Sequence, residues 1–350
     1  MATFTVSNIK DSGKGSLRKA IEQANTIDGY DRIEFSDRLS GQKISLISGE
    51  LTITDDLAID GLSGNRGVSI SGNNASRIFT VDDSDASNQV DVVINDLTIT
   101  EGKSNEGGGA IANAENLTIN NSVISNNQNT SQVPEAGGGA IRNSVDGQLN
   151  INESLIKGNQ SQAFGGGITN FGQLFFNSST ITNNQVSGGG GGGIDNRGIR
   201  AEITGSAVVN NLNNVGSAGG LGNGTAQTET SISNSIIAGN HSFIDGAGLF
   251  VNAGNVTVTD SIIEHNKAQN SGGGIGIAAD GNLTLNQSSV INNEAVNEGG
   301  GFFNLGSATI DNSTVTGNIA SDGGGIFNAN VFESSDTLIL GNIPNDALGV

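Results

Sequence analysis

Residues 107–127 read GGGAIANAENLTINNSVISNN, and residues 137–159 read GGGAIRNSVDGQLNINESLIKGN. Both stretches begin with a glycine run and Ile-x-Asn, continue with alternating apolar residues, and close with Ser, an aliphatic residue and Asn. Looser and tighter copies of this pattern recur as far as residue 328, spaced by about 27 residues. A period of this length is typical of a solenoid, in which each repeat covers the apolar face of its neighbour.

The repeats are predicted to be strands rather than helices. Apolar residues alternate with polar ones in Leu117-Thr-Ile-Asn and in Val256-Thr-Val-Thr, which is the period of a β-strand. Glycine triplets would also cost a helix roughly 1 kcal/mol per glycine. The sequence therefore predicts an all-β fold, a right-handed parallel β-helix of about ten coils of about 27 residues each.

The recurring asparagine at the end of each copy is predicted to have a structural role. In a parallel stack, identical positions lie one above the other, so asparagine amides can form a hydrogen-bonded ladder. Asparagine also tolerates a left-handed backbone, which we expect at these turns. The recurring serine is expected at a bend because it is small. The predicted ladder consists of Asn127, Asn159, Asn184, Asn211, Asn240, Asn266, Asn293 and Asn318.

The first 40 residues are predicted to cap the solenoid. Residues 3–7 resemble a strand, and Ser16 is a suitable N-cap for a helix whose Leu17, Ile21 and Ala24 share one face. We expect a cap over residues 1–40 (strand, amphipathic helix, strand), the β-helix over residues 41–345, and a tail over residues 346–350, all in one domain.

Composition excludes several classes of function. The formal net charge is -20 and the pI is about 4.2, which disfavours nucleic acid as a partner. Cysteine is absent, so thiol chemistry is excluded. No apolar stretch is long enough for direct membrane insertion, and the N-terminus lacks the pattern of a signal peptide.

Two segments resemble known bacterial proteins. The segment Asp-Ser-Gly-x-Gly-Ser-Leu-Arg-x-Ala-Ile-x-x-Ala-Asn at residues 11–25 resembles the N-terminal cap of CSLREA and choice-of-anchor β-helix proteins. The glycine and Asn repeats are similar to those of polymorphic outer-membrane proteins, although Ile or Val stands where Phe is usual. The resemblance implies a right-handed parallel β-helix at an extracellular or cell-surface location, and it implies little about activity.

Three candidate ligand sites are weak. The glycines at 188–193 lack the strand, helix and Lys of a phosphate-binding loop, and Gly193-Ile-Asp195 is an isolated match to a calcium repeat. The acidic loop Asp82–Asp85 is better explained as a solvated turn than as a Ca²⁺ site. His241 and His265, near Glu264, are expected to approach each other on the surface without a third metal ligand. The sequence predicts no catalytic, cofactor-binding or metal-binding residue, and no cofactor.

Enzymes with this fold act on acidic polysaccharides, and they use carboxylates and cations that are clustered on one outward face of the protein. On the best-defined outward face, Glu202 and Asp311 lie coils apart, and no cation is expected beside either. A threonine column could instead order water for ice binding, interrupted at Asn150, Phe175, Glu202 and Ser231. Its expected members are Thr52, Thr98, Thr118, Thr257, Thr284 and Thr309.

The favoured function is a non-catalytic secreted or cell-surface β-helix, acting as an adhesin-like scaffold or as a module that binds carbohydrate or a partner. Its contacts are expected in the longer loops, residues 128–136 and 224–229. The alternatives are a polysaccharide lyase, hydrolase or epimerase, and an ice-binding protein. Expected partners are a polysaccharide or another surface protein.

Overall fold

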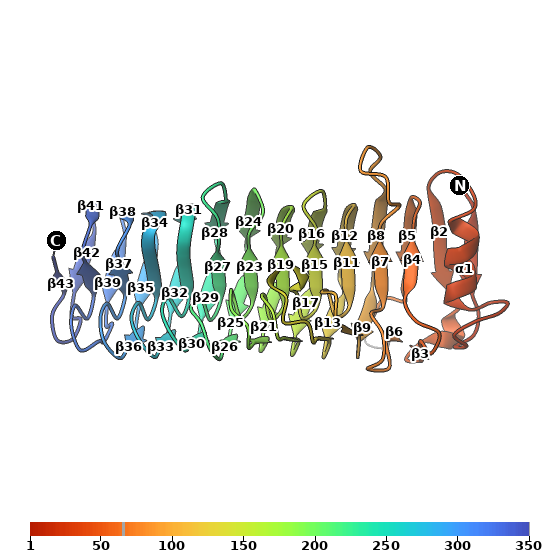
Figure 1. Cartoon of the computed structure of the whole chain (residues 1–350), viewed down its shortest axis with the longest axis horizontal. Helices are drawn as coiled ribbons and strands as arrows, with labels where there is room; N and C mark the ends of the chain where they lie inside the picture. Colours follow the sequence, from red (N-terminus) through yellow and green to blue (C-terminus); the bar gives the residue numbers. More distant parts are fainter. Residues whose placement is uncertain (65–66, 350) are drawn as a thin grey trace.

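The chain forms a single stack of parallel coils, with its helix at the N-terminal end (Figure 1). The computed structural model describes residues 1–64 and 67–349. Each strand pairs in parallel with the corresponding strand of the next coil, which confirms the predicted parallel β-helix. One of the three sheets contributes one strand to each coil and has 12 strands in the described part of the chain, so there are about twelve coils rather than ten. The extra coils precede residue 104, where the glycine run that marks the repeat is missing.

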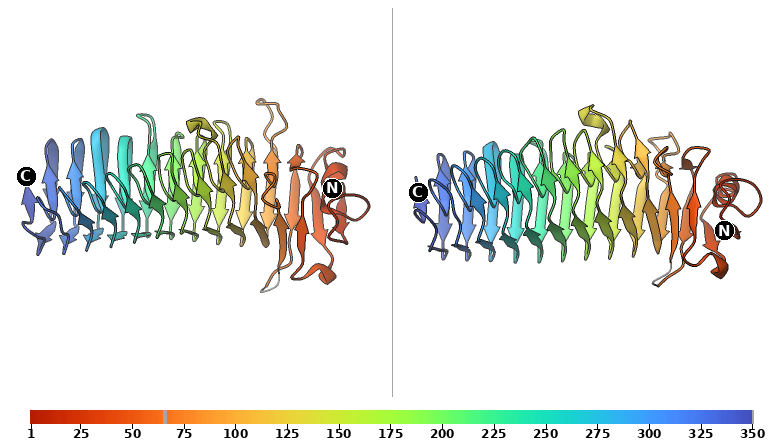
Figure 2. Two further views of the ribbon diagram at one scale, coloured as in Figure 1. Left: turned by 60° about the horizontal axis from the view of Figure 1, so that its bottom comes forward. Right: turned by 90° about the horizontal axis from the view of Figure 1, so that it is seen from below.

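Two of the three sheets extend along nearly the whole stack, whereas the eight-stranded sheet runs only from residue 103 to residue 295. The views in Figure 2 show that loops protrude from the stack mainly in its N-terminal half. The largest sheet has two rows of strands. Its first row consists of β4 (Leu51–Ile53), β7 (Phe79–Val81), β11 (Ile111–Asn113), β15 (Ile141–Asn143), β19 (Ile168–Asn170), β23 (Ile194–Asn196), β27 (Leu221–Asn223), β37 (Phe302–Asn304), β40 (Ile326–Asn328) and β43 (Ala347–Leu348). Its second row consists of β1 (Thr3–Val6), β2 (Asp31–Phe35), β5 (Leu57–Asp60), β8 (Asp91–Asn95), β12 (Asn116–Asn120), β16 (Gln148–Asn152), β20 (Gln173–Asn177), β24 (Arg200–Thr204), β28 (Glu229–Ser233), β38 (Ser307–Asp311) and β41 (Val331–Ser335). Two long strands, β31 (Leu249–Thr259) and β34 (Ile275–Asn286), belong to both rows.

The 12-stranded sheet adds one strand to each coil, and the eight-stranded sheet adds one strand to each of eight successive coils. The 12-stranded sheet consists of β3 (Lys43–Ser45), β6 (Val68–Ser71), β9 (Leu97–Thr100), β13 (Val123–Ser125), β17 (Leu155–Lys157), β21 (Thr180–Thr182), β25 (Ala207–Val209), β29 (Ile236–Ala238), β32 (Ile262–Glu264), β35 (Ser289–Ile291), β39 (Thr314–Thr316) and β42 (Leu338–Leu340). The eight-stranded sheet consists of β10 (Lys103–Ser104), β14 (Gln128–Asn129), β18 (Gln160–Ser161), β22 (Gln185–Val186), β26 (Leu212–Asn213), β30 (His241–Ser242), β33 (Lys267–Ala268) and β36 (Glu294–Ala295).

The core is made of apolar columns along the axis. Ile99, Ile124, Ile156 and Ile181 are paired in successive coils of the 12-stranded sheet, and all four are fully buried. Each such side chain stabilises the fold by roughly 1.5–3 kcal/mol relative to an exposed position. Because neighbours in a column belong to different coils, the apolar burial holds the coils to one another.

The predicted ladder asparagines lie in a single file and are buried. Their amides are linked by Nδ2 to Oδ1 hydrogen bonds of 2.9–3.1 Å from Asn127 through to Asn318. Each Oδ1 also accepts the backbone N–H of the preceding ladder residue, as Asn211 does from Asn184 at 3.0 Å. Asn342 continues the file, and its Nδ2 donates to Asp346. The ladder therefore satisfies the backbone polar groups of one corner in every one of these coils.

The left-handed backbone at this corner belongs to the residue before each ladder asparagine, not to the asparagine itself. Asn126, Asn183 and Asn210 have φ of 54–56°, and glycine takes the same position at Gly158 and Gly239. The ladder asparagine must point into the coil to reach its neighbour, so the turn falls on the residue before it. The expected position of the turn was therefore wrong by one residue.

Two further ladders were missed by sequence analysis. The serine of each repeat is more than a small residue at a bend, because its Oγ accepts the backbone N–H of the preceding serine: Ser154 accepts from Ser122 and Ser179 from Ser154, both at 3.0 Å. The asparagines of Ile-x-Asn form a second amide ladder, in which Asn113 donates to Asn143 at 2.7 Å. Their regular recurrence in the sequence was the available signal.

The N-terminal segment covers the first coil. Helix α1 (Leu17–Ala24) buries Leu17, Ala20, Ile21 and Ala24, and the Ser16 side chain accepts the Lys19 N–H at 3.2 Å, which confirms the predicted N-cap. Strand β2 pairs with both β1 and β5, so the sheet extends into the cap. The short 3₁₀ helices are η1 (Asp37–Leu39) and η2 (Pro134–Ala136).

At the other end, β43 pairs with β40, so the predicted tail at 346–350 contributes a strand to the largest sheet. No helix in the described residues has the length and apolar character needed to cross a membrane.

Candidate functional site

The outward-facing columns lack the regularity of the ladders, and one of them combines charged and aromatic residues with glycine. It is formed by the middle residue of each first-row strand, which points away from the core and differs from coil to coil. We call it the central column: Thr52, Thr80, Ala112, Arg142, Thr169, Asp195, Gly222, Phe250, Gly276, Phe303 and Phe327. Structural columns repeat one residue type because each copy contacts the next. A column without repetition consists of positions that the stacking does not dictate, and such positions are free to form a site.

Arg142 carries a charge that no carboxylate in the described part of the chain neutralises. Its Nε donates to the Glu135 carbonyl at 2.8 Å, its Nη1 donates to the Ser144 hydroxyl at 2.7 Å, and its Cζ lies 5.4 Å from the centre of the Phe171 ring. Partial burial and the positive charge of Arg77 lower the pKa of this guanidinium. The group is therefore held in place, partly desolvated, and open to an anion.

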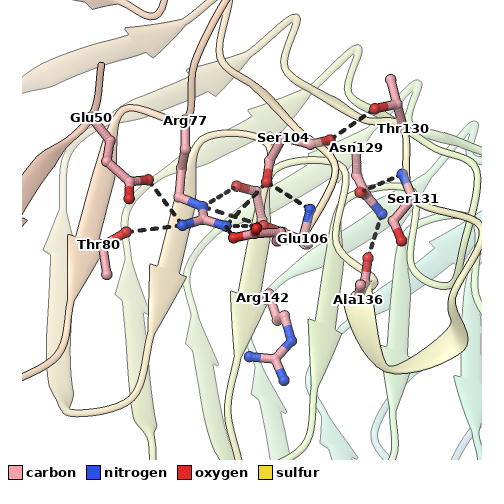
Figure 3. Close-up of polar contacts among 12 residues, drawn as sticks. Glu50, Arg77, Thr80, Ser104, Glu106, Asn129, Thr130, Ser131, Ala136 and Arg142 are labelled. Carbon is pink, nitrogen blue, oxygen red and sulfur yellow. Dashed lines mark hydrogen bonds and ion pairs between the residues drawn. The ribbon is translucent and has the colours of Figure 1, made fainter. Parts of the chain in front are cut away.

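Arg77 is nearby but has a different role. Its Nη1 donates to the Glu50 carboxylate at 2.9 Å and to the Thr80 hydroxyl at 3.0 Å, and its Nη2 donates to Ser104 at 3.0 Å. Figure 3 shows these contacts, together with an Arg142 that makes none with the other residues drawn. Arg77 is 9% exposed and its donors are satisfied, so we assign it to structure.

Two coils further along, an arginine is paired with a buried acid. Asp195 accepts the Arg197 Nε at 2.7 Å, and the Arg197 Cζ lies 3.8 Å from the centre of the Phe164 ring. The Asp195 side chain is 2% exposed, and burial raises its pKa despite the neighbouring Arg197 charge. The plane of Arg197 is thus fixed from two sides, and its charge, unlike that of Arg142, is compensated.

A cavity of about 180 Å³ opens next to this pair. In the central column, Gly222 stands between Asp195 and Phe250, and the cavity occupies the space that a side chain at Gly222 would fill. Asp195, Arg197, Ser217, Phe250 and Asn252 are among its lining residues. This volume is smaller than the roughly 300–1,000 Å³ of pockets for drug-sized ligands. The cavity has room for one small ring rather than for a whole cofactor.

The second row presents an arginine that sequence analysis overlooked. Arg200 forms an ion pair with Glu202 and places its Cζ 5.4 Å from the centre of the Phe175 ring. The expectation that no cation stands beside Glu202 was wrong, because alternate residues of one strand project from the same face. Asp311 has no cationic partner among the described residues: its carboxylate accepts hydrogen bonds from Asn312 and Ser335.

The predicted threonine column is shorter than expected. Thr118, Thr257, Thr284 and Thr309 share a column, with Asn150, Phe175, Glu202 and Ser231 between the first two. Thr52 belongs to the central column, and Thr98 belongs to the 12-stranded sheet, so neither lies in this column. The apolar alternation of a short strand does not reveal which of three sheets it joins, and this caused the error.

The acidic loop acquires a partner from the next coil. Asp82, Asp83 and Glu115 each place a carboxylate oxygen within 4.8 Å of the other two. The Glu115 carboxylate already accepts the backbone N–H groups of Asp83 at 3.3 Å and Val90 at 3.0 Å, and burial raises its pKa. These bonds show that Glu115 fastens the loop to the stack. No independent feature of the cluster points to a bound cation.

The two histidines bond to different neighbours. The His241 Nε2 lies 3.2 Å from the Gln269 side chain, and the His265 Nδ1 lies 3.4 Å from the Glu264 carboxylate. Neither belongs to a group of potential metal ligands among the described residues.

No family model matches the chain, and no curated protein matches it. The solved structures that align with it include a lyase and an epimerase module. A mannuronic acid specific polysaccharide family 6 lyase from human gut microbiota aligns over 97% of this chain and 86% of its own, with 10% identity and a TM-score of 0.44. The A-module of the mannuronan C-5 epimerase AlgE6 of Azotobacter vinelandii aligns over 96% and 98%, with 13% identity and a TM-score of 0.40.

Proposed function

We propose that this protein is a non-catalytic extracellular or cell-surface β-helix that binds acidic polysaccharide along its central column. The observation that carries the proposal is Arg142, a partly buried guanidinium without a carboxylate partner in the described residues, held over Phe171. On a chain with a formal charge of -20, an acidic polymer is repelled by most of the surface. A specific cationic position is therefore needed to recognise it.

The shape of the site favours an extended ligand. The central column runs along the axis, and successive positions are about 4.8 Å apart. Arg142 and the cavity beside Asp195 lie in this one column, so a linear chain along the axis contacts both. The loop at 128–136 supplies the Glu135 carbonyl that orients Arg142, in keeping with the expectation that this loop takes part in binding.

The test compares three proteins against a linear polyuronate and a neutral glucan of similar length. Charge-assisted hydrogen bonds contribute roughly 1.5–3 kcal/mol, so we expect Arg142→Ala to weaken polyuronate binding by roughly tenfold to a hundredfold. Arg142→Lys keeps the charge but not the planar fork, so its affinity for the polyuronate should lie between those of wild type and Arg142→Ala. Arg38→Ala is the matched control, because Arg38 is exposed and this substitution removes the same formal charge at a different place.

Binding is measured by calorimetry at low and moderate salt, and the same polymers are incubated with and without Ca²⁺. Equal affinity of the Arg142 and Arg38 variants for the polyuronate would contradict the proposed site. Formation of unsaturated uronate, of shorter chains or of epimerised units would contradict the non-catalytic assignment and support a lyase, hydrolase or epimerase.

A further inference from the structure

The cavity beside Asp195 has the features of a subsite for a neutral ring. Phe250 is flanked in the column by Gly222 on one side and Gly276 on the other. On the Gly276 side the ring fills the space, because a Cβ built on Gly276 would meet the Phe250 Cδ2 at 2.9 Å. On the Gly222 side the cavity remains open, so Phe250 lines it with part of an aromatic side chain.

Hydrogen-bonding groups surround this aromatic wall. Arg197 uses its Nε on Asp195, and its two terminal nitrogens make no hydrogen bond within the described residues. The Ser217 Oγ accepts the Asp245 N–H at 3.2 Å and keeps its own proton to donate. The Asn252 Nδ2 donates to the Gly224 carbonyl at 3.1 Å, which leaves its Oδ1 as an acceptor. The cavity thus offers donors and an acceptor around one apolar surface.

The charge of the cavity distinguishes it from Arg142. Asp195 compensates the charge of Arg197, so an anionic group gains little here, whereas hydroxyl groups can use both donors and acceptors. Asp195 is itself 2% exposed and acts as a positioning residue, since it fixes the plane of Arg197 together with Phe164.

We propose that this cavity binds one neutral pyranose ring of a glycan, stacked on Phe250 and hydrogen-bonded to Arg197, Ser217 and Asn252. The inference deepens the proposed function and rests on it. Arg142 and Asp195 are two coils apart in the central column, roughly 10 Å along the axis. The ligand is then a heteropolymer in which an acidic unit at Arg142 and a neutral unit in the cavity belong to one chain.

The cavity can be filled without changing the fold. A Cβ on Gly222 would lie 3.2 Å from the Gly191 N, 3.3 Å from the Ala218 Cβ and 3.4 Å from the Asp195 Oδ1, which requires only small shifts. The same column already holds a threonine at Thr169. We therefore choose Gly222→Thr as the blocking variant. Phe250→Ala is the second variant, which removes the platform instead of filling the space.

The probes are the methyl glycosides of glucose, mannose and galactose, observed by NMR titration against the full chain. For so small a ligand we expect a dissociation constant on the order of millimolar for at least one of them. Gly222→Thr and Phe250→Ala should each weaken it by roughly tenfold. Thr284→Ala, in the second row, should leave the dissociation constant unchanged. Circular dichroism establishes that each variant is folded.

The Arg142→Ala variant separates the two proposals. If it binds the glycoside like wild type and binds the polyuronate roughly tenfold to a hundredfold more weakly, both proposals stand. If wild type binds no glycoside, or if Gly222→Thr and Phe250→Ala bind it as well as wild type does, the subsite is refuted while polyuronate binding at Arg142 is untouched. If the Arg142→Ala variant binds the polyuronate as tightly as the Arg38→Ala control does, while glycoside binding is retained, only the proposed function is refuted.

Discussion

Removal of one ladder asparagine should destabilise the solenoid far more than removal of an exposed side chain. In Asn211→Ala, four hydrogen bonds are lost: Oδ1 with the Asn184 backbone N and Nδ2, both at 3.0 Å, and Nδ2 with the Ile181 carbonyl at 3.0 Å and the Asn240 Oδ1 at 3.1 Å. The orphaned N–H of Asn184 costs roughly 1–3 kcal/mol, and each other lost bond costs roughly 0.5–1.5 kcal/mol. The expected loss in the free energy of unfolding is about 5 kcal/mol.

Two measurements check this value. Denaturant unfolding gives the loss in the free energy of unfolding, with Thr284→Ala as the control, because the Thr284 side chain makes no hydrogen bond in the described residues and should cost less than about 0.5 kcal/mol. Hydrogen exchange at single-residue resolution should show the Asn184 amide losing its protection while amides several coils away keep theirs, because repeats interact only with neighbours. A loss below about 1 kcal/mol, or unchanged exchange at Asn184, would refute the role of the ladder.

The remaining predictions concern Asp195 and the left-handed turns. Burial raises the pKa of Asp195 above its ordinary 3.8, so the native state binds a proton on this carboxyl group more tightly than the unfolded chain does. The stability contributed by that bound proton is lost as the pH rises from about 3.8 through the raised pKa. Asp195→Asn should therefore gain stability relative to wild type as the pH rises across that window in denaturant titrations; a relative gain by wild type would contradict this. His265→Gly should raise the free energy of unfolding by about 0.5–1 kcal/mol, because His265 has φ of 53° where Gly239 stands one coil earlier. A loss of stability in this variant would show that the His265 side chain matters more than the backbone conformation.

Much of the fold follows from the sequence because stacking makes the repeat visible. In a parallel coil, residue 127 contacts residue 159 and residue 159 contacts residue 184, so the same side chain is favoured at each position and the ladders appear as a period. The strands, the ladder residues and the N-cap at Ser16 could be read in this way. The early coils lack the glycine run, so their number was underestimated.

The candidate site could not be read in the same way, because it consists of exceptions to the period. Arg142 meets Phe171, and Arg197 meets Phe164, only because adjacent coils bring together residues about one repeat apart. The sequence shows that the middle position of Ile-x-Asn varies, but not that these positions form one column along the axis.

The sequence by itself determined a parallel β-helix and its buried ladders, since every coil must satisfy the same backbone groups with the same side chains. Only the tertiary structure decided which outward positions share a column, as the separation of Thr52 and Thr98 from Thr118 shows. Outward side chains contribute little to stacking, so no periodic constraint records their arrangement. The register of the sheets, set by the core, places the cavity at Gly222 on one line with Arg142, which has no carboxylate partner in the described residues.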